Sequence, residues 1–266
     1  MKLACQENLV DVPTFAEKLD ILECAGYEGV EVWGTDLETR ISEINHAMRG
    51  RSLRVATVCA GYGGCLLDAA KSERDKAMDD IKRLLGLCAD VGASGLIVVP
   101  IFGPPKINDL SPYKTALQLE GELLAVELKE LAERAQEAGV YVILEPLNRY
   151  QTHFLNRLEQ ATQVCEEIGS PFVKIMADFY HMNIEEASIP DAIRLAKDHL
   201  VHVHLSDSNR LPPGCGHVDF AAGFAALSEI GFEGYAALEC AGPRLSEDRL
   251  RNIRDYVVSQ LARARS

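Results

Sequence analysis

The sequence predicts an α/β fold, a (β/α)8 TIM barrel that occupies residues 1–266 as a single domain. Three observations predict it. Eight short runs rich in Val, Ile and Leu alternate with longer segments of helical periodicity, as in parallel βα units. Several of the helical segments end at a glycine. The length of 266 residues is also close to the roughly 250 residues of a typical barrel.

The elements follow one another in a regular order. Strands are predicted at residues 3–6, 29–33, 54–60, 95–100, 140–146, 173–178, 201–206 and 235–240. Helices are predicted at residues 13–25, 72–91, 117–138, 157–168, 189–197, 220–230 and 246–264. Five glycines follow predicted helices, where a left-handed cap is needed: Gly26, Gly92, Gly139, Gly169 and Gly231. An open doubly wound sheet is the competing architecture, but residues 6–13 lack the glycines that its first βα turn normally carries.

Composition excludes several classes of partner. The chain has 40 acidic and 27 basic residues and a formal net charge of −13, which disfavours nucleic acid and anionic membranes. No apolar run is long enough to span a bilayer, and the N-terminus turns polar too early for a signal peptide. The eight cysteines are scattered, as expected for reduced thiols. We therefore expect a cytoplasmic protein.

Four consecutive predicted strands end on residues that commonly bind metals. They are Glu145, Asp178, His204 and Glu239. Because the carboxyl ends of barrel strands meet at one mouth, these side chains should converge near the axis. Each residue alone has an ordinary structural interpretation, such as an ion pair or a helix cap, but four together favour a metal site.

The donor set indicates which metal would bind. Burying three unpaired carboxylates is costly, so a divalent ion is the natural compensation. Three carboxylates and one imidazole, without thiolate, favour Mn²⁺, with Mg²⁺ and Co²⁺ as alternatives, over a structural zinc.

Four segments carry a family resemblance. They are LEPLNRY at residues 144–150, DFYHM at 178–182, HLSDSNR at 204–210 and PGCGHVDF at 213–220. Together they resemble the xylose-isomerase-like sugar isomerase/epimerase superfamily, and most closely its ketose 3-epimerases of the tagatose and psicose (allulose) type. The intervals of 33, 26 and 35 residues between the four candidate ligands agree with that group.

The resemblance implies roles for particular residues. It implies one divalent metal held by Glu145, Asp178, His204 and Glu239, and contacts from His181 and Arg210 to a small-molecule sugar substrate. Gln151 stands where the 3-epimerases usually carry a glutamate, and an amide can bind a hydroxyl but cannot accept a proton as a carboxylate does. Related abasic-site endonucleases use extra histidines on strands three and four, which this chain lacks.

The predicted reaction is epimerisation at C3 of an unphosphorylated ketose through a metal-stabilised enediolate. Glu145 and Glu239 would be the catalytic residues, one serving each face of C3 as general base or acid. One alternative is a 1,2-isomerase of the hydroxypyruvate type, or an inosose isomerase or dehydratase. A second is a non-catalytic barrel that binds a sugar or metal. Arg149 and Arg210 leave open whether the substrate is phosphorylated.

Other residues near the predicted mouth have less specific signals. Trp33 could form an apolar wall beside a sugar or simply pack, and Glu31 could face the mouth or be paired. His202 has the strand parity of His204, so it should point inward one layer deeper. His181 is expected on a loop after strand six. We also expect a homo-oligomer, either a dimer or a tetramer.

Overall fold

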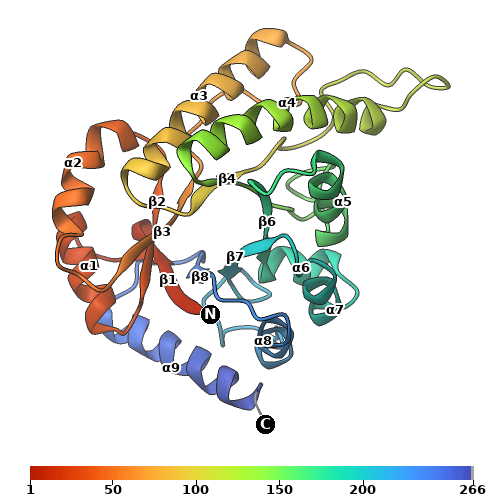
Figure 1. Cartoon of the computed structure of the whole chain (residues 1–266). Coiled ribbons are helices and arrows are strands. Elements are labelled where there is room, and N and C mark those ends of the chain that lie inside the picture. The colour runs from red at the N-terminus through yellow and green to blue at the C-terminus, as the bar shows by residue number, and fades with distance from the viewer. Residues whose placement is uncertain (265–266) are drawn as a thin grey trace.

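The computed structural model describes residues 1–264 and contains a closed barrel of eight parallel strands in sequence order (Figure 1). The strands are β1 (Lys2–Gln6), β2 (Gly29–Trp33), β3 (Arg54–Cys59), β4 (Gly95–Val98), β5 (Tyr141–Leu144), β6 (Val173–Asp178), β7 (Leu200–Leu205) and β8 (Tyr235–Leu238). Pairing of β1 with β8, which begins at Lys2 and Tyr235, closes the ring. The predicted (β/α)8 barrel is confirmed.

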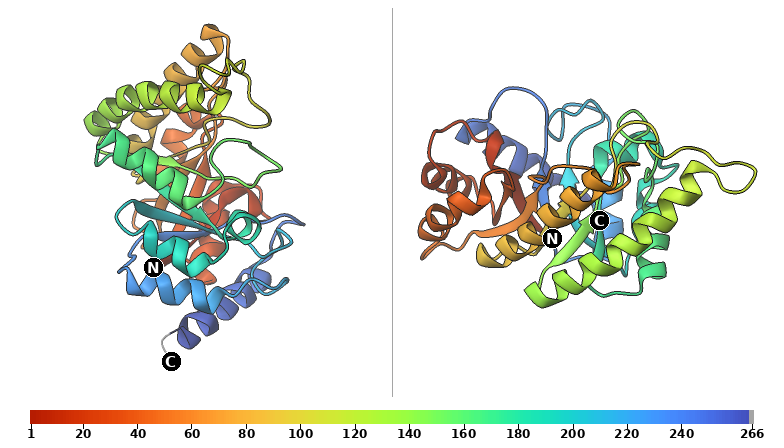
Figure 2. Two further views of the ribbon diagram at one scale, coloured as in Figure 1. Left: turned by 90° about the vertical axis from the view of Figure 1, so that its right-hand side faces the viewer. Right: turned by 90° about the horizontal axis from the view of Figure 1, so that it is seen from above.

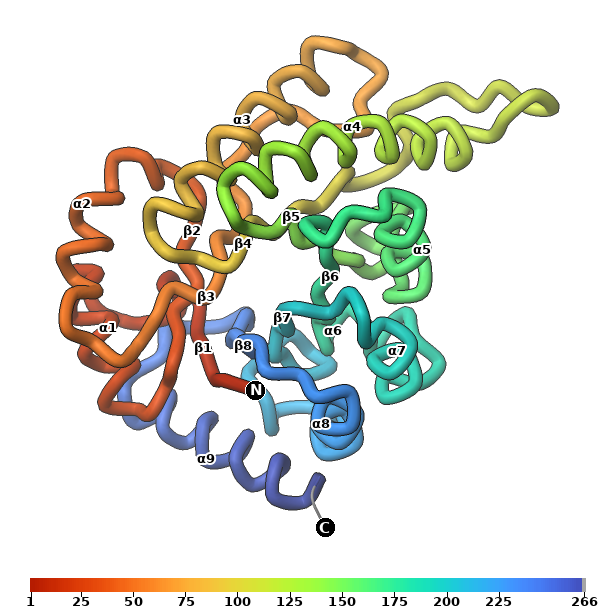
Figure 3. The backbone as a smooth tube through the Cα atoms, viewed as in Figure 1, coloured from red at the N-terminus to blue at the C-terminus, as the bar shows by residue number. Residues whose placement is uncertain are grey.

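Helices surround the strands on the outside of the barrel, as the backbone tube in Figure 3 shows. They are α1 (Phe15–Cys24), α2 (Leu37–Ala47), α3 (Lys71–Asp90), α4 (Ala116–Ala138), α5 (Leu158–Ile168), α6 (Phe179–Glu185), α7 (Ile189–Leu195), α8 (Phe220–Glu229) and α9 (Glu247–Arg263). A short 3₁₀ turn, η1 (Glu7–Leu9), follows β1. Seven of these helices lie where the sequence predicts them, with ends that shift by up to two residues.

Two helices were missed by the sequence prediction. α2 begins after Asp36, whose side chain makes no capping hydrogen bond, and it buries only Leu37 and Ile44. The apolar stripe is therefore too sparse to show a helical period. α6 has only seven residues. The placement of His181 on a loop is wrong, because His181 lies within α6.

Local signals explain where the long helix α4 starts and stops. Thr115 and Gln118 form a reciprocal capping box at its start. At its end Gly139 has φ of 70°, a left-handed conformation that costs glycine little. The other four glycines predicted as caps also have positive φ, so this prediction is confirmed.

The barrel interior is built in layers. Ala4, Ala56 and Ala237 form one small apolar cluster, and Cys59, Ile97, Ile143 and Met176 form another. Polar side chains also lie inside, each at most 2% exposed: Gln6, Glu31, Thr57 and His202. Leucines and phenylalanines of the helices build the larger core between strands and helices. The polar side chains inside the barrel are the unusual feature, since charged residues are rarely buried without partners.

The connection from β4 to α4 forms an arm that projects beyond the barrel (Figures 1 and 2). An isolated antiparallel bridge joins Leu110 to Lys114 within this arm. Tyr113 on this arm is 75% exposed. Among residues 1–264, no helix is long and apolar enough to cross a membrane.

Candidate metal centre and substrate pocket

The four predicted metal ligands converge at one end of the barrel. Glu145 follows β5, Asp178 ends β6, His204 lies in β7 and Glu239 follows β8. Each offers one ligand atom, and these atoms lie within 4.8 Å of one another. His204 Nδ1 is 2.8 Å from Glu239 Oε2, and 3.7 Å from both Glu145 Oε1 and Asp178 Oδ2. The structure therefore brings together all four residues that the strand ends predict.

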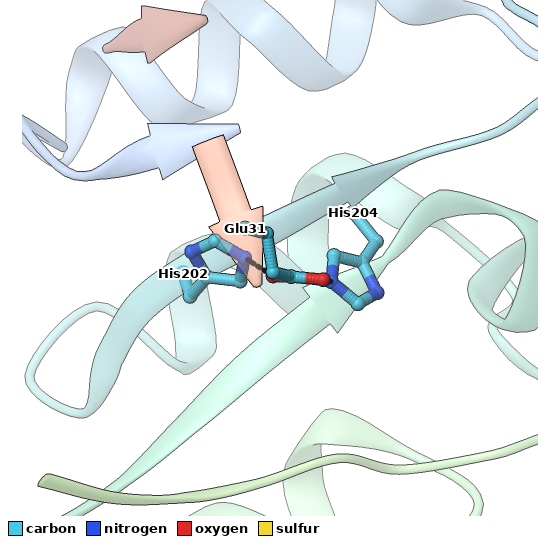
Figure 4. Close-up of side chains that lie close together, drawn as sticks. All are labelled: Glu31, His202 and His204. Carbon is cyan, nitrogen blue, oxygen red and sulfur yellow. Dashed lines mark hydrogen bonds and ion pairs between the residues drawn. The ribbon is translucent and has the colours of Figure 1, made fainter. Parts of the chain in front are cut away.

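The two ring nitrogens of His204 face two different groups of acidic side chains. Its Nε2 lies 3.0 Å from Glu31 Oε2, on the side away from the other three carboxylates. Figure 4 shows the Glu31 carboxylate between the rings of His202 and His204. Because Glu31 is an acceptor, Nε2 carries the proton and Nδ1 faces Glu145, Asp178 and Glu239. This arrangement suits a histidine that ligates a metal through Nδ1.

The donor set fits a divalent cation. Burial would lower the pKa of His204, but Glu31, Glu239 and the other carboxylates raise it well above its ordinary value. The carboxylates around Nδ1 therefore favour positive charge at this point, which a divalent ion would supply. Glu145, Asp178, His204 and Glu239 would hold it.

Glu31 is fully buried and saturated with hydrogen-bond donors. Gln6 Nε2 donates to it at 2.8 Å, the Thr57 hydroxyl at 2.6 Å and His202 Nε2 at 2.8 Å. Burial would raise the pKa of Glu31, but His204 and His202 hold it well below its ordinary value. Glu31 thus lies beneath the ligands as a paired anion and does not face the mouth. His202 lies one layer deeper than His204, as predicted.

Asp178 uses its two oxygens for different purposes. Oδ1 accepts hydrogen bonds from the backbone N–H groups of Tyr180 and His181, which caps α6. Oδ2 points into the ligand cluster and accepts a hydrogen bond of 2.6 Å from Arg210 Nη1. Burial would raise the pKa of Asp178, but Arg210 and His181 hold it well below its ordinary value. The helix-cap and metal-ligand interpretations are therefore compatible.

Arg210 lies directly against the ligand cluster. Its Nη2 donates to Glu239 Oε2, and its guanidinium lies over the ring of Tyr180, 4.9 Å from the ring centre. The backbone of Arg210 has φ of 63°, an uncommon conformation for a residue with a side chain. Arg149, in contrast, pairs with Glu185 at 2.8 Å and is not part of the pocket lining. The two arginines are thus not arranged as one anion clamp.

His181 also faces the cluster, and Asn148 determines which nitrogen does so. The backbone N–H of Asn148 donates to His181 Nδ1 at 3.1 Å, and its side-chain amide lies 2.8 Å from the same atom. Nε2 therefore carries the proton. It lies 3.9 Å from Glu145 Oε1 and 3.8 Å from Asp178 Oδ2.

A cavity of about 420 Å³ opens beside the cluster. This volume lies in the usual range for small-molecule sites, about 300–1,000 Å³. Its lining includes Glu145, His181, Arg210 and Glu239 together with the predicted substrate residues Trp33 and Gln151. Asn148 was not among the residues predicted from the sequence, and the position of Glu31 beneath His204 was not predicted either. Asn148 lies in the LEPLNRY segment, and Glu31 interrupts an apolar strand; these were the available signals.

Comparison with known proteins identifies the family. Residues 19–257 match the xylose isomerase-like TIM barrel family, and the chain belongs to it. The 3-dehydro-D-guloside 4-epimerase of Escherichia coli (strain K12) is 34% identical over 257 residues, which cover 96% of this chain and 97% of that protein. The D-psicose 3-epimerase of Ruminiclostridium cellulolyticum is 37% identical over 247 residues, with 88% and 80% covered.

A solved structure agrees over nearly the whole length. The apo form of 3-keto-D-glucoside 4-epimerase from E. coli has a TM-score of 0.86 and 33% identity, and the match covers 98% of this chain and 99% of that one. The predicted superfamily and the predicted enzyme class, an isomerase, are confirmed. The relatives include epimerases of two positional kinds.

Proposed function

We propose that the protein is a divalent-metal-dependent epimerase that inverts a hydroxyl-bearing carbon beside a ketone of a sugar. The observation that carries this proposal is the convergence of Glu145, Asp178, His204 and Glu239 in one cluster, of which Glu145 and Glu239 line a pocket. The first substrate class is a 3-keto glycoside, inverted at C4. This refines the prediction of a ketose 3-epimerase, because a 4-epimerase matches the chain over 97% of its own length.

A second candidate reaction is epimerisation at C3 of a free ketose. The D-psicose 3-epimerase with 37% identity favours it. Gln151 disfavours it, since the glutamate typical of the resembling 3-epimerases is absent. Both reactions remove a proton from the carbon next to a ketone, so the same residues would serve either substrate.

Different residues of the site would perform different parts of the reaction. A bound divalent ion would supply a Lewis acid that polarises the ketone. Glu145 and Glu239 follow strands three apart on the ring, so they approach a substrate from different sides. One would remove the proton and the other would return a proton to the opposite face. Burial and the nearby Glu239 raise the pKa of Glu145 above its ordinary value.

His181 and Arg210 would hold the substrate. The Nε2–H group of His181 is a fixed donor, because Asn148 occupies Nδ1. Arg210 bonds to both Asp178 and Glu239, so it would orient Glu239 while it offers its remaining donors to sugar oxygens. Gln151 and Trp33 would contact the substrate farther from the reacting carbon.

Proton exchange in D₂O tests the proposal. The Mn²⁺-loaded protein is incubated with a 3-keto glucoside, D-fructose or D-tagatose, and NMR locates the deuterium. We expect label at C4 of the 3-keto sugar in both epimers. Label at C3 of the ketoses, without reaction of the keto glucoside, would favour the second candidate. Label at C1 or C2 with an aldose product would replace epimerisation by 1,2-isomerisation, and no exchange at all would favour a binding protein. Glu239→Gln should abolish exchange, and the exposed Glu28→Gln is the control.

Two expectations accompany this function and have their own measurements. Metal analysis of the purified and the reconstituted protein should find about one divalent ion per chain, with Mn²⁺ preferred over Mg²⁺ and Co²⁺. Light scattering after gel filtration should give the mass of a dimer or a tetramer of this 29.2 kDa chain.

A further inference from the structure

The pocket has two chemically different sides. Two of the candidate metal ligands, Glu145 and Glu239, form the charged side together with His181 and Arg210. The opposite wall comes from the ends of β2, β3 and β4 and from the loops that follow them. Its side chains are mainly apolar and include Trp33, Tyr62, Val99, Ile101 and Phe102, with Leu147 nearby. A sugar bound with its ketone at the metal ligands would direct one end toward this wall.

The polar atoms of this apolar wall are mostly paired or covered. The Nε1 atom of Trp33 is buried and has no hydrogen-bond partner. The Tyr62 hydroxyl accepts a hydrogen bond from the backbone N–H of Val99 at 2.8 Å and donates to the Val99 carbonyl at 3.1 Å. Lys106 at the rim is paired with Asp68 at 2.8 Å. Gln151 is the remaining uncharged polar side chain of the lining, cysteines aside. The hydroxyls of a second sugar ring would lose their hydrogen bonds to water here and find few protein groups to replace them. Binding of such a ring to this wall is therefore unfavourable.

Phe102 extends the apolar wall to the rim. Its side chain remains 59% exposed. Backbone hydrogen bonds hold its segment in place: the N–H of Gly103 donates to the Gln151 carbonyl at 2.7 Å, and the N–H of His153 donates to the Gly103 carbonyl at 3.2 Å. An exposed aromatic ring fixed at the rim of an apolar pocket is typical of a binding surface.

We propose that this wall binds an apolar aglycone, so that the substrate is an aryl or alkyl 3-keto glycoside in preference to a keto disaccharide. The inference rests on the proposed function, since the ketone must face the metal ligands. It adds the chemical class of the group attached to the sugar. Trp33 and Phe102 would contact that group, and Tyr62 would present its ring while its hydroxyl stays bonded to Val99.

Binding can be measured without catalysis because Trp33 is the only tryptophan of the chain and lines this pocket. The Mn²⁺-loaded protein is titrated with methyl glucoside, phenyl glucoside and glucosyl glucoside, none of which carries the ketone. The fluorescence of Trp33 reports binding. We expect the Kd of the phenyl compound to be about tenfold lower than that of the methyl compound, and the disaccharide to gain nothing.

Two variants in the arm between β4 and α4 test whether Phe102 causes the preference for the phenyl compound. Phe102→Ser should remove most of the preference for phenyl over methyl, while Tyr113→Ser should leave it intact because Tyr113 is exposed on the same arm but does not line the pocket. Equal Kd values for the phenyl and methyl compounds, or tighter binding of the disaccharide, would overturn the proposal.

Kinetics with the corresponding 3-keto glucosides separate this inference from the function on which it rests. We expect the phenyl compound to show a lower KM for exchange at C4 with a similar kcat. A phenyl preference in fluorescence without exchange at C4 of any keto glucoside would support the apolar site and overturn the proposed reaction.

Discussion

The two nitrogens of His204 determine how the site can hold a metal. Nε2 faces Glu31 and Nδ1 faces three carboxylates, so one ring connects a buried anion inside the barrel with the pocket above it. Glu31 accepts further hydrogen bonds from Gln6, Thr57 and His202. These bonds fix the position of its carboxylate. An outer carboxylate of this kind orients the histidine and raises its basicity toward a metal.

Glu31→Gln should weaken metal binding although Glu31 is not one of the four convergent ligands. The amide nitrogen of glutamine would face hydrogen-bond donors, and the ring of His204 would no longer be held with its proton on Nε2. We expect the Kd for Mn²⁺ to rise about 10- to 100-fold by calorimetry. Glu28→Gln is the matched control, since Glu28 precedes the same strand and is exposed. A wild-type Kd in folded Glu31→Gln protein would show that Glu31 does not act through His204.

At the level of the elements, α4 has one glycine within it and another directly after it, and their backbone conformations differ. Gly121 lies inside the helix with open space where a Cβ atom would be added, whereas Gly139 follows the helix with φ of +70°. Gly121→Ala should stabilise the protein by about 0.5–1 kcal/mol, because glycine is a poor helix former. Gly139→Ala should destabilise it by about 1 kcal/mol, because alanine avoids left-handed backbone. Denaturant unfolding of both variants measures the difference, and the same sign for both would refute the cap assignment.

The same helix carries a buried acid that should make stability depend on pH. The Glu127 side chain is only 9% exposed, and Arg74 lies 3.8 Å away. Burial raises the pKa of Glu127 to about 7, although Arg74 opposes the shift. Between about pH 4.5 and pH 7 the native state keeps a proton that the unfolded state has lost, so Glu127 makes stability fall as pH rises through this window.

Glu127→Gln removes that titration. We expect the variant to be more stable than wild type by on the order of 1–2 kcal/mol near pH 8, after allowance for solvent screening. The advantage should disappear by about pH 4, where Glu127 is protonated in both states. Urea unfolding at several pH values checks this. An advantage that does not change with pH would mean that Glu127 titrates normally.

On the scale of the whole molecule, charge and metal binding are linked. The chain has a formal net charge of −13, and the barrel gathers Glu31, Glu145, Asp178 and Glu239 around one imidazole. Arg210 offsets part of this charge through Asp178 and Glu239. A divalent ion would offset more, and a ligand that binds only the native state stabilises it by mass action.

Mn²⁺ should therefore raise the melting temperature of the chelator-treated protein. At a concentration of 100 times its Kd it adds about 2.7 kcal/mol, which corresponds to a rise of roughly 5–10 °C for a protein of this size. Calorimetry measures the shift. Asp178→Asn is the control, because asparagine keeps an oxygen to cap α6 but loses the charge toward the ligand cluster. An equal rise in Asp178→Asn would show that the ion binds elsewhere.

Much of the fold and the metal site could be predicted from the sequence because both depend on local patterns. Alternating apolar runs and helical segments predict the barrel, and parallel strands bring their carboxyl ends to one mouth. The convergence of Glu145, Asp178, His204 and Glu239 could therefore be predicted from strand ends alone. The helix α2 could not, since two buried residues make no recognisable period.

The remaining features of the site depend on closure of the barrel. The contact between Glu31 and His202 joins β2 to β7 across 171 residues of sequence, and no local pattern specifies which buried side chains meet inside a closed ring. The pairing of Asn148 with His181 and the apolar wall from β2, β3 and β4 also depend on how separate segments meet in space. The sequence by itself determined the barrel and the residues that end its strands, because these follow from periodicity. The tertiary structure decided the proton positions on His181 and His204 and the shape of the pocket, because these depend on contacts between distant residues.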